Sequence, residues 1–354
     1  MKIGLIGMPK SGKTTLFNAL TKSEISTTAF AKAEPNIAIV KVLDGRITKL
    51  SAMYQPKKTI YASCEFVDFV GVAKEDEKAD AFSGDMMKLI RNADALAIVV
   101  RGFDSDVLGA TADPKKELAA ITDELLLSDL MTTEKRLERI AAGMKKGQKT
   151  DLILAEEKVL KRILDHLNAG KPIRELAFTA EEEAAIRGFQ FLTKKPAIAV
   201  LNSSETAYGK SDALLAEFRA QYRAIEFAGS FEMELSRLSE EEAKIFMADM
   251  GITESARDRL IALAYETLGY ISFFTVGPDE VRAWNIKRGE TALQAAGAIH
   301  TDLARGFIAA ECFSFDDLMA CGSEKAIKEK GRFRLEGKEY VVKDGEILNI
   351  RFNV

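Results

Sequence analysis

The sequence predicts an α/β fold that is interrupted by a long helical hairpin and followed by a small α+β module. Three observations lead to this prediction. Short apolar runs alternate with helical segments over residues 2–100, a helical spacing of three and four dominates residues 115–190, and short strands return from about residue 271. At roughly 100–200 residues per domain, a chain of 354 residues also favours two or three domains over one.

The expected parallel sheet depends on short apolar runs separated by polar loops, a pattern typical of buried strands. These runs are residues 2–6, 37–42, 64–69, 95–101 and 196–201. An amphipathic segment at residues 16–20 follows the first run and gives it the form of a βα unit. Because the run at 196–201 comes after the long helical region, the sheet resumes there. We therefore expect a discontinuous α/β domain at residues 1–114 and 190–270.

The intervening residues 115–189 have the pattern of two long antiparallel helices. Apolar residues recur every three or four positions over residues 118–140 and again over 152–167, with charged residues on the opposite face. Residues 143–147 begin and end with glycine and break the pattern between the two stretches. Two later helices begin at capping boxes, which are Thr179 with Glu182 and Ser239 with Glu242.

Residues 271–354 predict a separate α+β module. The expected strands are residues 271–276, 281–286, 339–342 and 347–354, and the expected helices are 291–296 and 324–330. A module of ~80 residues is large enough to fold on its own.

Composition limits the classes of function. The chain has 50 Lys and Arg against 54 Asp and Glu, a formal charge of −4, so no general attraction to DNA or to an anionic membrane is expected. Its three cysteines, Cys64, Cys312 and Cys321, are far apart, which fits a reducing compartment and gives neither a disulfide framework nor a zinc site. All apolar runs are far shorter than the ~20 residues that span a bilayer. We therefore expect a cytoplasmic protein without DNA or membrane contact.

The strongest chemical motif is GMPKSGKT at residues 7–14, directly after a predicted strand and before a predicted helix. This is the GxxxxGK[ST] phosphate loop, in which backbone N–H groups and a helix N-terminus face the phosphates. In this motif the lysine, here Lys13, reaches the β- and γ-phosphate oxygens, and the hydroxyl of Thr14 binds Mg²⁺. The sequence therefore predicts a nucleotide site.

A second element, Asp68 to Gly71, has the DxxG pattern after an apolar strand. In P-loop proteins an aspartate at such a strand end helps to hold Mg²⁺, and we expect the glycine N–H to meet the γ-phosphate. Small GTPases place a water-orienting glutamine nearby, but this chain continues with Val72, an apolar residue that cannot orient water.

Base recognition is expected from Asn202 to Glu205, the sequence NSSE after the strand at residues 196–201. Guanine readers carry NKxD there, with an aspartate that accepts from guanine N1–H and its exocyclic amine. Adenine has neither group. A longer glutamate and an asparagine can instead meet its N6 amine and N7, so this motif favours adenine.

These motifs, in this order and together with AFAKAEPNIAIV, VVRGF, RAWNI, QAAGAIHTD, GFIAAE and YVVKDGEILNIRFNV, resemble the YchF or Obg-like ATPase family. The resemblance runs from Met1 to Val354. It implies a TRAFAC-class P-loop G domain with an α-helical hairpin inserted at residues 115–189 and a C-terminal TGS domain of ubiquitin-like β-grasp fold at 271–354. It also implies slow hydrolysis of ATP in preference to GTP and association with ribosomes.

The resemblance carries the following roles onto this sequence. Lys13 and Gly71 are expected to be catalytic, and Thr14 and Asp68 to bind Mg²⁺. The residues expected at the phosphates are Met8, Pro9, Lys10, Ser11, Gly12, Lys13, Thr14 and Thr15. Those expected at the base are Asn202, Glu205, Ala228 and Gly229.

The chain departs from the family pattern at several places. Lys10-Ser11 stand where relatives have Asn-Val, and Lys32 stands where relatives have a threonine that serves the metal. Residues 72–78 are charged where relatives have a glycine-rich switch, and residues 228–230 (Ala-Gly-Ser) replace a Ser-Ala-Lys loop that backs the base. These departures leave three alternatives open: a GTPase of the same architecture, a nucleotide-bound interaction module that does not hydrolyse, and a kinase, which would need an Arg-rich lid that the hairpin does not resemble.

A ribosome or rRNA contact is expected through the TGS domain, the helical hairpin, or both. The mixed-charge region at residues 324–351 contains Lys325, Lys328 and Lys330 near Phe333, although neighbouring glutamates dilute it. The two histidines, His166 and His300, have no partners at catalytic or metal-binding spacing and are expected to be structural.

Overall fold

The computed structural model describes residues 1–21, 35–69, 84–104, 111–249, 252 and 254–353. The chain forms two compact units. The first combines Met1–Ala38 with Glu65–Arg257, and the second combines Ile39–Cys64 with Asp258–Val354. The described helices include none that is both long and apolar enough to cross a bilayer.

The first unit is built on a six-stranded sheet with the order β2-β4-β1-β5-β6-β7. Its strands are β1 (Lys2–Ile6), β2 (Asn36–Lys41), β4 (Ser63–Asp68), β5 (Ala95–Gly102), β6 (Ala197–Ser203) and β7 (Arg223–Phe227). The pairs β4–β1, β1–β5, β5–β6 and β6–β7 are all parallel. The central strands β5 and β6 are buried along almost their whole length, which explains why their sequences are continuous apolar runs.

Helices surround this sheet, and capping boxes precede two of them. They are α1 (Lys13–Thr21), α3 (Gly84–Arg91), α6 (Ala180–Ile186), α7 (Asp212–Phe218), α8 (Gly229–Arg237) and α9 (Glu240–Asp249), with short 3₁₀ turns at Ile173–Glu175 and Arg187–Phe189. Thr179 and Glu182 form the expected capping box before α6. The Ser239–Glu242 pair makes the same reciprocal bonds before α9, between 3.0 and 3.3 Å.

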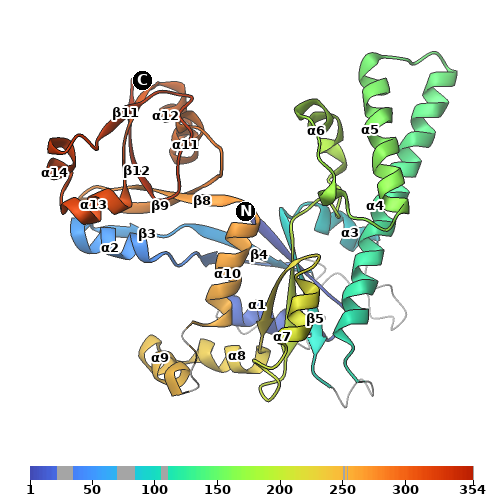
Figure 1. Ribbon diagram of the computed structural model, residues 1–354, viewed down its shortest axis with the longest axis horizontal. Coiled ribbons are helices and arrows are strands. Elements are labelled where there is room, and N and C mark those ends of the chain that lie inside the picture. Colours follow the sequence, from blue (N-terminus) through green and yellow to red (C-terminus); the bar gives the residue numbers. More distant parts are fainter. Residues whose placement is uncertain (22–34, 70–83, 105–110, 250–251, 253, 354) are drawn as a thin grey trace. The chain divides into compact units, whose positions relative to one another are not determined.

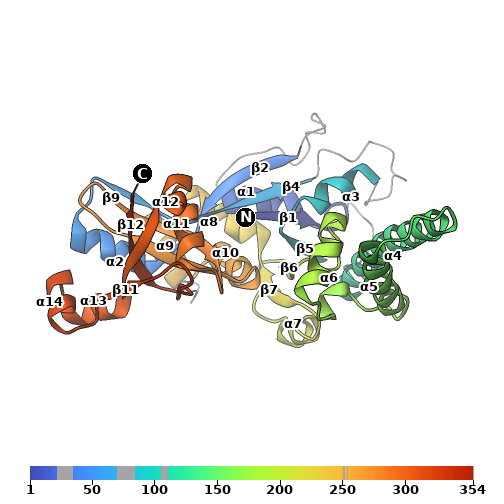
Figure 2. The ribbon, with the colours of Figure 1, turned by 90° about the horizontal axis from the view of Figure 1, so that it is seen from above.

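The predicted hairpin is present as α4 (Pro114–Lys145) and α5 (Asp151–Asn168), which lie side by side in Figures 1 and 2. Asp113 caps the first helix and Thr150 the second. The contact between them is an apolar cluster that includes Ile140, Val159 and Ile163. The helix continues to Lys145, so the break predicted at residues 143–147 begins three residues too early.

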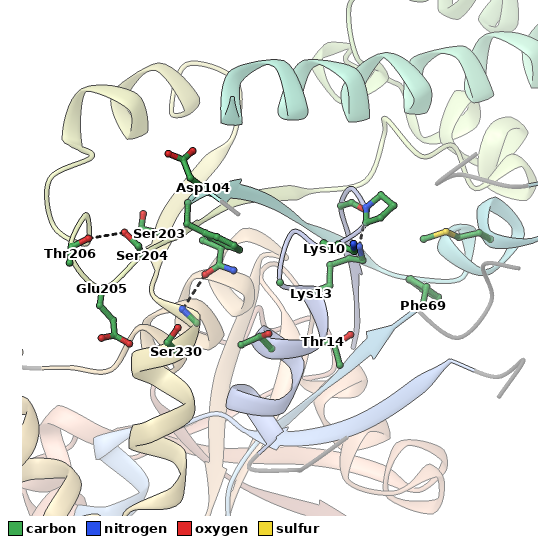
Figure 3. A pocket seen from close by; sticks show the side chains of 18 residues that line it. Lys10, Lys13, Thr14, Phe69, Asp104, Ser203, Ser204, Glu205, Thr206 and Ser230 are labelled. Atoms are coloured by element: carbon green, nitrogen blue, oxygen red, sulfur yellow. Dashed lines mark hydrogen bonds between the residues drawn. The ribbon is translucent and has the colours of Figure 1, made fainter. Parts of the chain in front are cut away.

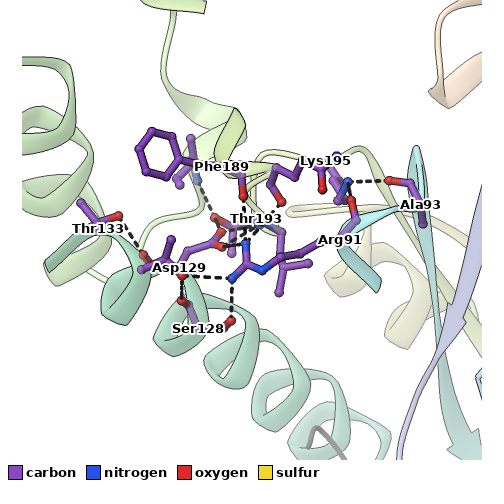
Figure 4. A network of polar contacts seen from close by, with 12 residues as sticks. Arg91, Ala93, Ser128, Asp129, Thr133, Phe189, Thr193 and Lys195 are labelled. Atoms are coloured by element: carbon purple, nitrogen blue, oxygen red, sulfur yellow. Dashed lines mark hydrogen bonds and ion pairs between the residues drawn. The ribbon is translucent and has the colours of Figure 1, made fainter. Parts of the chain in front are cut away.

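A buried polar network joins α4 to the rest of the first unit (Figure 4). Asp129, in the middle of α4, has no exposed surface, and its carboxylate accepts from the N–H groups of Leu192 (2.9 Å) and Thr193 (2.7 Å) and from the Thr193 hydroxyl (2.8 Å). Arg91, at the end of α3, reaches Asp129 at 3.5 Å and donates to Ser128 and Thr132. Burial raises the pKa of Asp129 despite these donors.

The second unit has its own six-stranded sheet, ordered β11-β10-β12-β8-β9-β3. The strands are β3 (Lys58–Ile60), β8 (Tyr270–Thr275), β9 (Glu280–Lys287), β10 (Phe307–Ser314), β11 (Arg334–Glu336) and β12 (Glu346–Phe352). The helices are α2 (Gly45–Tyr54), α10 (Ala256–Thr267), α11 (Ala292–Ile299), α12 (Thr301–Arg305), α13 (Phe315–Cys321) and α14 (Glu324–Glu329). Phe273 and Leu348 belong to an apolar core beneath α11.

The structure of this unit differs from the sequence prediction in several places. The strand predicted at residues 339–342 is wrong: Val341 forms only an isolated bridge with Thr291, because Tyr340 turns back onto Gly337 and accepts from the N–H of Ala292. Strand β10 was not predicted. The segment Ile39–Cys64, assigned above to the α/β domain, belongs by its contacts to the second unit, where β3 pairs with β9.

Candidate functional site

A cavity of about 820 Å³ opens where the carboxyl ends of β1, β4, β5 and β6 meet (Figure 3). This edge of a parallel sheet is the usual ligand position in α/β folds. Residues of the loop after β1 line one side of the cavity, and residues 202–206, after β6, line the other. Two sequence motifs separated by nearly 190 residues therefore share one cavity.

Lys13 is the buried cation of the site. Its ammonium donates to the carbonyl oxygens of Gly7 (2.9 Å) and Met8 (2.8 Å), and the side chain belongs to the buried set. Burial lowers the pKa of Lys13 to about 8, although the charges of Asp68 and Glu117 act in the opposite direction. An anion in the cavity would supply the compensation that the buried ammonium lacks.

The curl of the loop depends on its two glycines. A Cβ at Gly7 would lie 2.3 Å from the carbonyl oxygen of Val99, and a Cβ at Gly12 would lie 2.0 Å from the Asn202 amide nitrogen. Gly12 also has a φ of +92°, a conformation that favours glycine. Lys10 is exposed and has a φ of 61°, which a lysine adopts at a cost of roughly 1–2 kcal/mol. The lysine at a family asparagine position thus occupies a backbone conformation that asparagine tolerates better.

The residues predicted to bind metal lie together. The Thr14 hydroxyl donates to the Asp68 carboxylate at 3.1 Å, and Asp68 has no exposed surface. Magnesium in nucleotide sites takes one or two protein oxygens and completes its shell with phosphate oxygens and water. A hydroxyl and a carboxylate at the edge of the phosphate loop fit this requirement. No group of three or more His, Cys, Asp or Glu side chains suited to a metal ion occurs among the described residues.

Asn202 joins the phosphate loop to the base side of the cavity. Its amide nitrogen donates to the Ser11 carbonyl at 3.0 Å, and its carbonyl accepts from the Gly229 N–H at 3.1 Å. One amide hydrogen of Asn202 is not used by these two bonds. Glu205 is exposed and lines the cavity, as do Gly229 and Ser230.

Most of the predicted site residues line this cavity. Pro9, Lys10, Gly12, Lys13, Thr14, Thr15, Asn202, Glu205 and Gly229 all do. Met8 and Ser11 contribute through their carbonyls to Lys13 and Asn202, and Ala228 is buried at the N-cap of α8. Gly71, Val72 and Lys32 lie outside the described residues.

Sequence reasoning missed several residues that form the site. Phe69, Met86, Phe103 and Asp104 also line the cavity. Glu226, buried in β7, accepts from the Ser203 hydroxyl at 2.5 Å and from the Gly209 N–H at 2.9 Å, and so fixes both ends of the loop that carries Glu205. The one signal for Glu226 in the sequence is an acidic residue inside the apolar strand RAIEF.

A second missed pair fixes the base of the hairpin. Arg101, in β5, donates to Glu117 through its backbone N–H (2.9 Å) and through Nε (3.3 Å). Glu117 lies in the first turn of α4, and Arg101 is buried. The pair therefore attaches α4 to the strand that continues into Phe103 and Asp104 at the cavity.

Comparison with known families finds two matching family models. Residues 2–154 match a model described as a 50S ribosome-binding GTPase. Residues 270–353 match the YchF-GTPase C-terminal model, which is described as a protein of unknown function.

Relatives extend this likeness over the whole chain. The ribosome-binding ATPase YchF of Bacillus subtilis is 38% identical over 99% of this chain and 99% of its own length. The protein of the same name from Escherichia coli O157:H7 is 37% identical over 100% of this chain and 99% of its own. The solved structure of the Schizosaccharomyces pombe YchF GTPase matches with a TM-score of 0.87 at 31% identity, covering 99% of this chain and 97% of that one. The predicted P-loop α/β fold is thereby confirmed.

Proposed function

Since the chain belongs to the YchF family, we propose that it is an ATP-binding switch that hydrolyses ATP slowly and acts on or near the ribosome. The observation that carries this proposal is the cavity that Lys13 and Thr14 line at one side and Asn202 with Glu205 at the other. Asp68 lies behind this lining, where its carboxylate accepts from the Thr14 hydroxyl. Phosphate chemistry and base recognition need these two groups of residues at the two ends of one ligand. The full-length relatives are named ribosome-binding ATPases, which supports both ATP as the nucleotide and the ribosome as the partner.

The phosphate side acts by position and charge. Lys13 binds β- and γ-phosphate oxygens, and the loop N–H groups and the N-terminus of α1 face the same oxygens. Thr14 and Asp68 would hold Mg²⁺, which neutralises negative charge on the phosphates when bound. Gly71 is proposed to meet the γ-phosphate. Val72 cannot orient the attacking water, which is why slow hydrolysis is expected.

The base side is proposed to read adenine. Asn202 has one amide hydrogen left for the base, and Glu205 offers an acceptor for an exocyclic amine. The Gly229 N–H is already bound to Asn202, so Gly229 acts by holding Asn202 and not by donating to the base. Phe103 also lines the cavity, where an aromatic ring can stack on any base.

Isothermal titration of the protein with ATP, GTP and ADP in the presence of Mg²⁺ tests this assignment. We expect ATP to bind more tightly than GTP. A tenfold preference for GTP would remove the adenine assignment and favour the second candidate, a GTPase of the same architecture. That candidate is supported by the word GTPase in the matched family model and in the name of the solved relative.

Turnover measurements separate the switch from a nucleotide-bound interaction module that does not hydrolyse. We expect Lys13→Ala to abolish hydrolysis, and we expect chelation of Mg²⁺ by EDTA to do the same for the wild type. Equal turnover by wild type and Lys13→Ala would show that the observed hydrolysis comes from another source. Lys32 and the charged residues 72–78 motivate the alternative.

We also propose the following domain organisation. Residues 1–114 and 190–270 form the G domain, residues 115–189 form the hairpin insertion, and residues 271–354 form a TGS domain of β-grasp type. The expected location is the cytoplasm, where ribosomes are found.

A further inference from the structure

The basic residues of the C-terminal region are largely engaged inside the second unit. Arg332 pairs with Asp317, Arg334 pairs with Glu346, and Arg351 pairs with Glu311. Lys328 lies over the ring of Phe333 at 4.6 Å, and Lys325 is 4.0 Å from Glu329. Much of the positive charge that the sequence places at residues 324–351 is thus balanced by the unit itself. This region is therefore a poor candidate for binding an anionic partner.

Much of the body of the hairpin is balanced in the same way. Its ion pairs join Arg136 to Glu156 (2.6 Å), Lys161 to Glu157 (2.7 Å), Arg162 to Glu182 (3.0 Å) and Lys115 to Glu217 (2.7 Å). Charge pairing of this kind is ordinary for exposed helices and contributes little to stability.

The far end of the hairpin differs. Lys145, Lys146 and Lys149 are all exposed where α4 turns into α5, and none forms an ion pair with a carboxylate among the described residues. Lys135 and Arg139, also exposed and without such a pair, precede Lys146 by eleven and seven residues, so the three share one face of α4. We call Lys145, Lys146 and Lys149 the basic tip; Lys135 and Arg139 extend its charge along α4.

The stability of the helices explains only part of the basic tip. Lys145 and Lys146 lie at the C-terminus of α4, where positive charge is favourable. Lys149 is different, because it directly precedes Thr150, the N-cap of α5. Positive charge at a helix N-terminus is unfavourable. Asp151, in the first turn of α5, offsets this charge, so Lys149 adds nothing to the stability of the helix.

We propose that the basic tip binds phosphate groups of ribosomal RNA. The inference rests on the ribosome contact proposed above and names the surface and the chemistry that make it. Lysines on a convex turn match an RNA backbone, which presents negative charge without requiring a pocket. The chain carries a net charge of −4, so a local patch of this kind is needed for an anionic partner.

Leu152, in the first turn of α5, lies close to these lysines in the sequence and is 82% exposed. An exposed leucine beside lysines could also indicate a membrane-binding surface. One inserted leucine contributes only about 1.5–3 kcal/mol, too little to hold a protein on a bilayer without further apolar anchors. RNA is therefore the partner that the tip fits best.

The test compares full-length wild type with the variant Lys145→Gln, Lys146→Gln, Lys149→Gln in co-sedimentation with purified ribosomes over a series of KCl concentrations. Each lost phosphate contact removes about 0.7–0.9 from the slope of log K against log salt. We expect the slope to become less steep by about 2 and the affinity at low salt to fall roughly tenfold or more. The matched control, Lys325→Gln, Lys328→Gln, Lys330→Gln on α14 and its C-cap, removes the same charge and should bind as the wild type does.

Four outcomes would overturn the inference. The tip variant could keep the affinity and the slope of the wild type, or the α14 control could lose binding in its place. The tip substitutions could weaken binding to ribosomes but not binding to protein-free 23S rRNA in a filter assay. In that case the tip would bind a ribosomal protein and not rRNA. Tip-dependent binding to phosphatidylglycerol vesicles, with none to ribosomes or rRNA, would assign it to a membrane.

The failure of the proposed function would look different. If the wild type does not bind ribosomes at all, the proposed ribosome contact is wrong. The rRNA assay then decides about the tip on its own. Weaker rRNA binding by the tip variant than by the wild type supports the inference, and equal rRNA binding by the two proteins overturns it. Circular dichroism and ATP turnover should be unchanged in the tip variant, because none of its three lysines lines the nucleotide cavity.

Discussion

Lys13 is a buried cation whose hydrogen-bond partners, among the residues that the structure describes, are two neutral carbonyl groups, those of Gly7 and Met8. A neutral acceptor compensates a buried ammonium less well than water does, and burial accordingly lowers the pKa of Lys13 to about 8. Negatively charged phosphate oxygens next to the ammonium would raise the pKa of Lys13 again. The residue that binds the phosphates should therefore gain a proton when the nucleotide binds.

This coupling can be measured by titration calorimetry at pH 8 in buffers of different ionisation enthalpy. Because burial lowers the pKa of Lys13 to about 8, part of the free protein carries an uncharged Lys13 at pH 8, so ATP binding should take up protons there. The uptake should be smaller at pH 7 than at pH 8, and ATP affinity should decrease as pH rises above 8. Lys10→Met, which removes an exposed lysine from the same loop, should leave the uptake unchanged. A binding enthalpy at pH 8 that does not depend on the buffer would contradict the assignment.

Glu226 makes a second prediction at the scale of one residue. Its carboxylate holds Ser203 and Gly209, at the two ends of the loop that carries Glu205. Glu226→Ala removes both bonds, so the loop should lose its fixed shape and ATP should bind roughly tenfold more weakly, about 1.4 kcal/mol. Glu226→Gln keeps one acceptor and should lose less. Equal affinities for wild type and Glu226→Ala would show that the loop does not take part in binding.

At the scale of elements, α4 is attached to the first unit at two separate points. The pair of Arg101 and Glu117 fixes its first turn beside the nucleotide cavity, and the network around Asp129 fixes its middle to α3 and to residues 189–195. Met86 of the same α3 lines the cavity. The hairpin is therefore attached, at both points, to segments that also form the nucleotide site.

The central attachment should dominate the stability of the hairpin. Asp129→Asn replaces an acceptor for three N–H or O–H groups with an amide that brings its own donors into a fully buried position. We expect the free energy of unfolding to fall by about 2–4 kcal/mol in urea titrations. Asp123→Asn, an exposed change on the same helix, is the control and should shift it by less than about 0.5 kcal/mol. A similar small effect for both variants would show that the network is dispensable.

For the whole molecule, the sequence predicts best those parts whose structure depends on neighbours in the chain. The buried parallel strands leave continuous apolar runs, and the phosphate loop needs only its own glycines and the helix that follows. Strand β10 was missed because Glu311 interrupts its apolar residues. That carboxylate is tolerated because Asn349, on the neighbouring strand β12, donates to it at 2.8 Å. Such a partner, 38 residues away, is not visible in a local pattern.

The same limit applies to the candidate site. The motif residues Lys13, Thr14, Asp68 and Asn202 could be identified because each lies at or just after the end of a recognisable strand. Three of them line one cavity, and Asp68 is bonded to Thr14 at its edge. Glu226 could not, because its role depends on two loop residues that are distant in sequence.

The assignment of Ile39–Cys64 to the second unit leads to a prediction about the independence of the C-terminal module. Strand β3 pairs with β9, so that Lys58 to Ile60 lie opposite Glu280 to Arg282. Helix α2 adds a bond from the Tyr54 hydroxyl to Glu324 at 2.7 Å and an ion pair from Arg46 to Asp344 at 2.8 Å. A boundary near residue 271 would remove all of these contacts.

We therefore expect a fragment of residues 258–354 to unfold at a lower temperature, and less cooperatively, than the same fragment co-expressed with residues 39–64. The reason is that strand β9 becomes an open edge of the sheet when β3 is absent. Thermal unfolding followed by circular dichroism measures the difference. A co-expressed segment in which Arg46 and Tyr54 are replaced by Gln and Phe is the matched control and should restore only part of it. Identical unfolding curves with and without the segment would mean that the C-terminal module is complete without residues 39–64, and that this segment belongs functionally to the nucleotide-binding part of the chain.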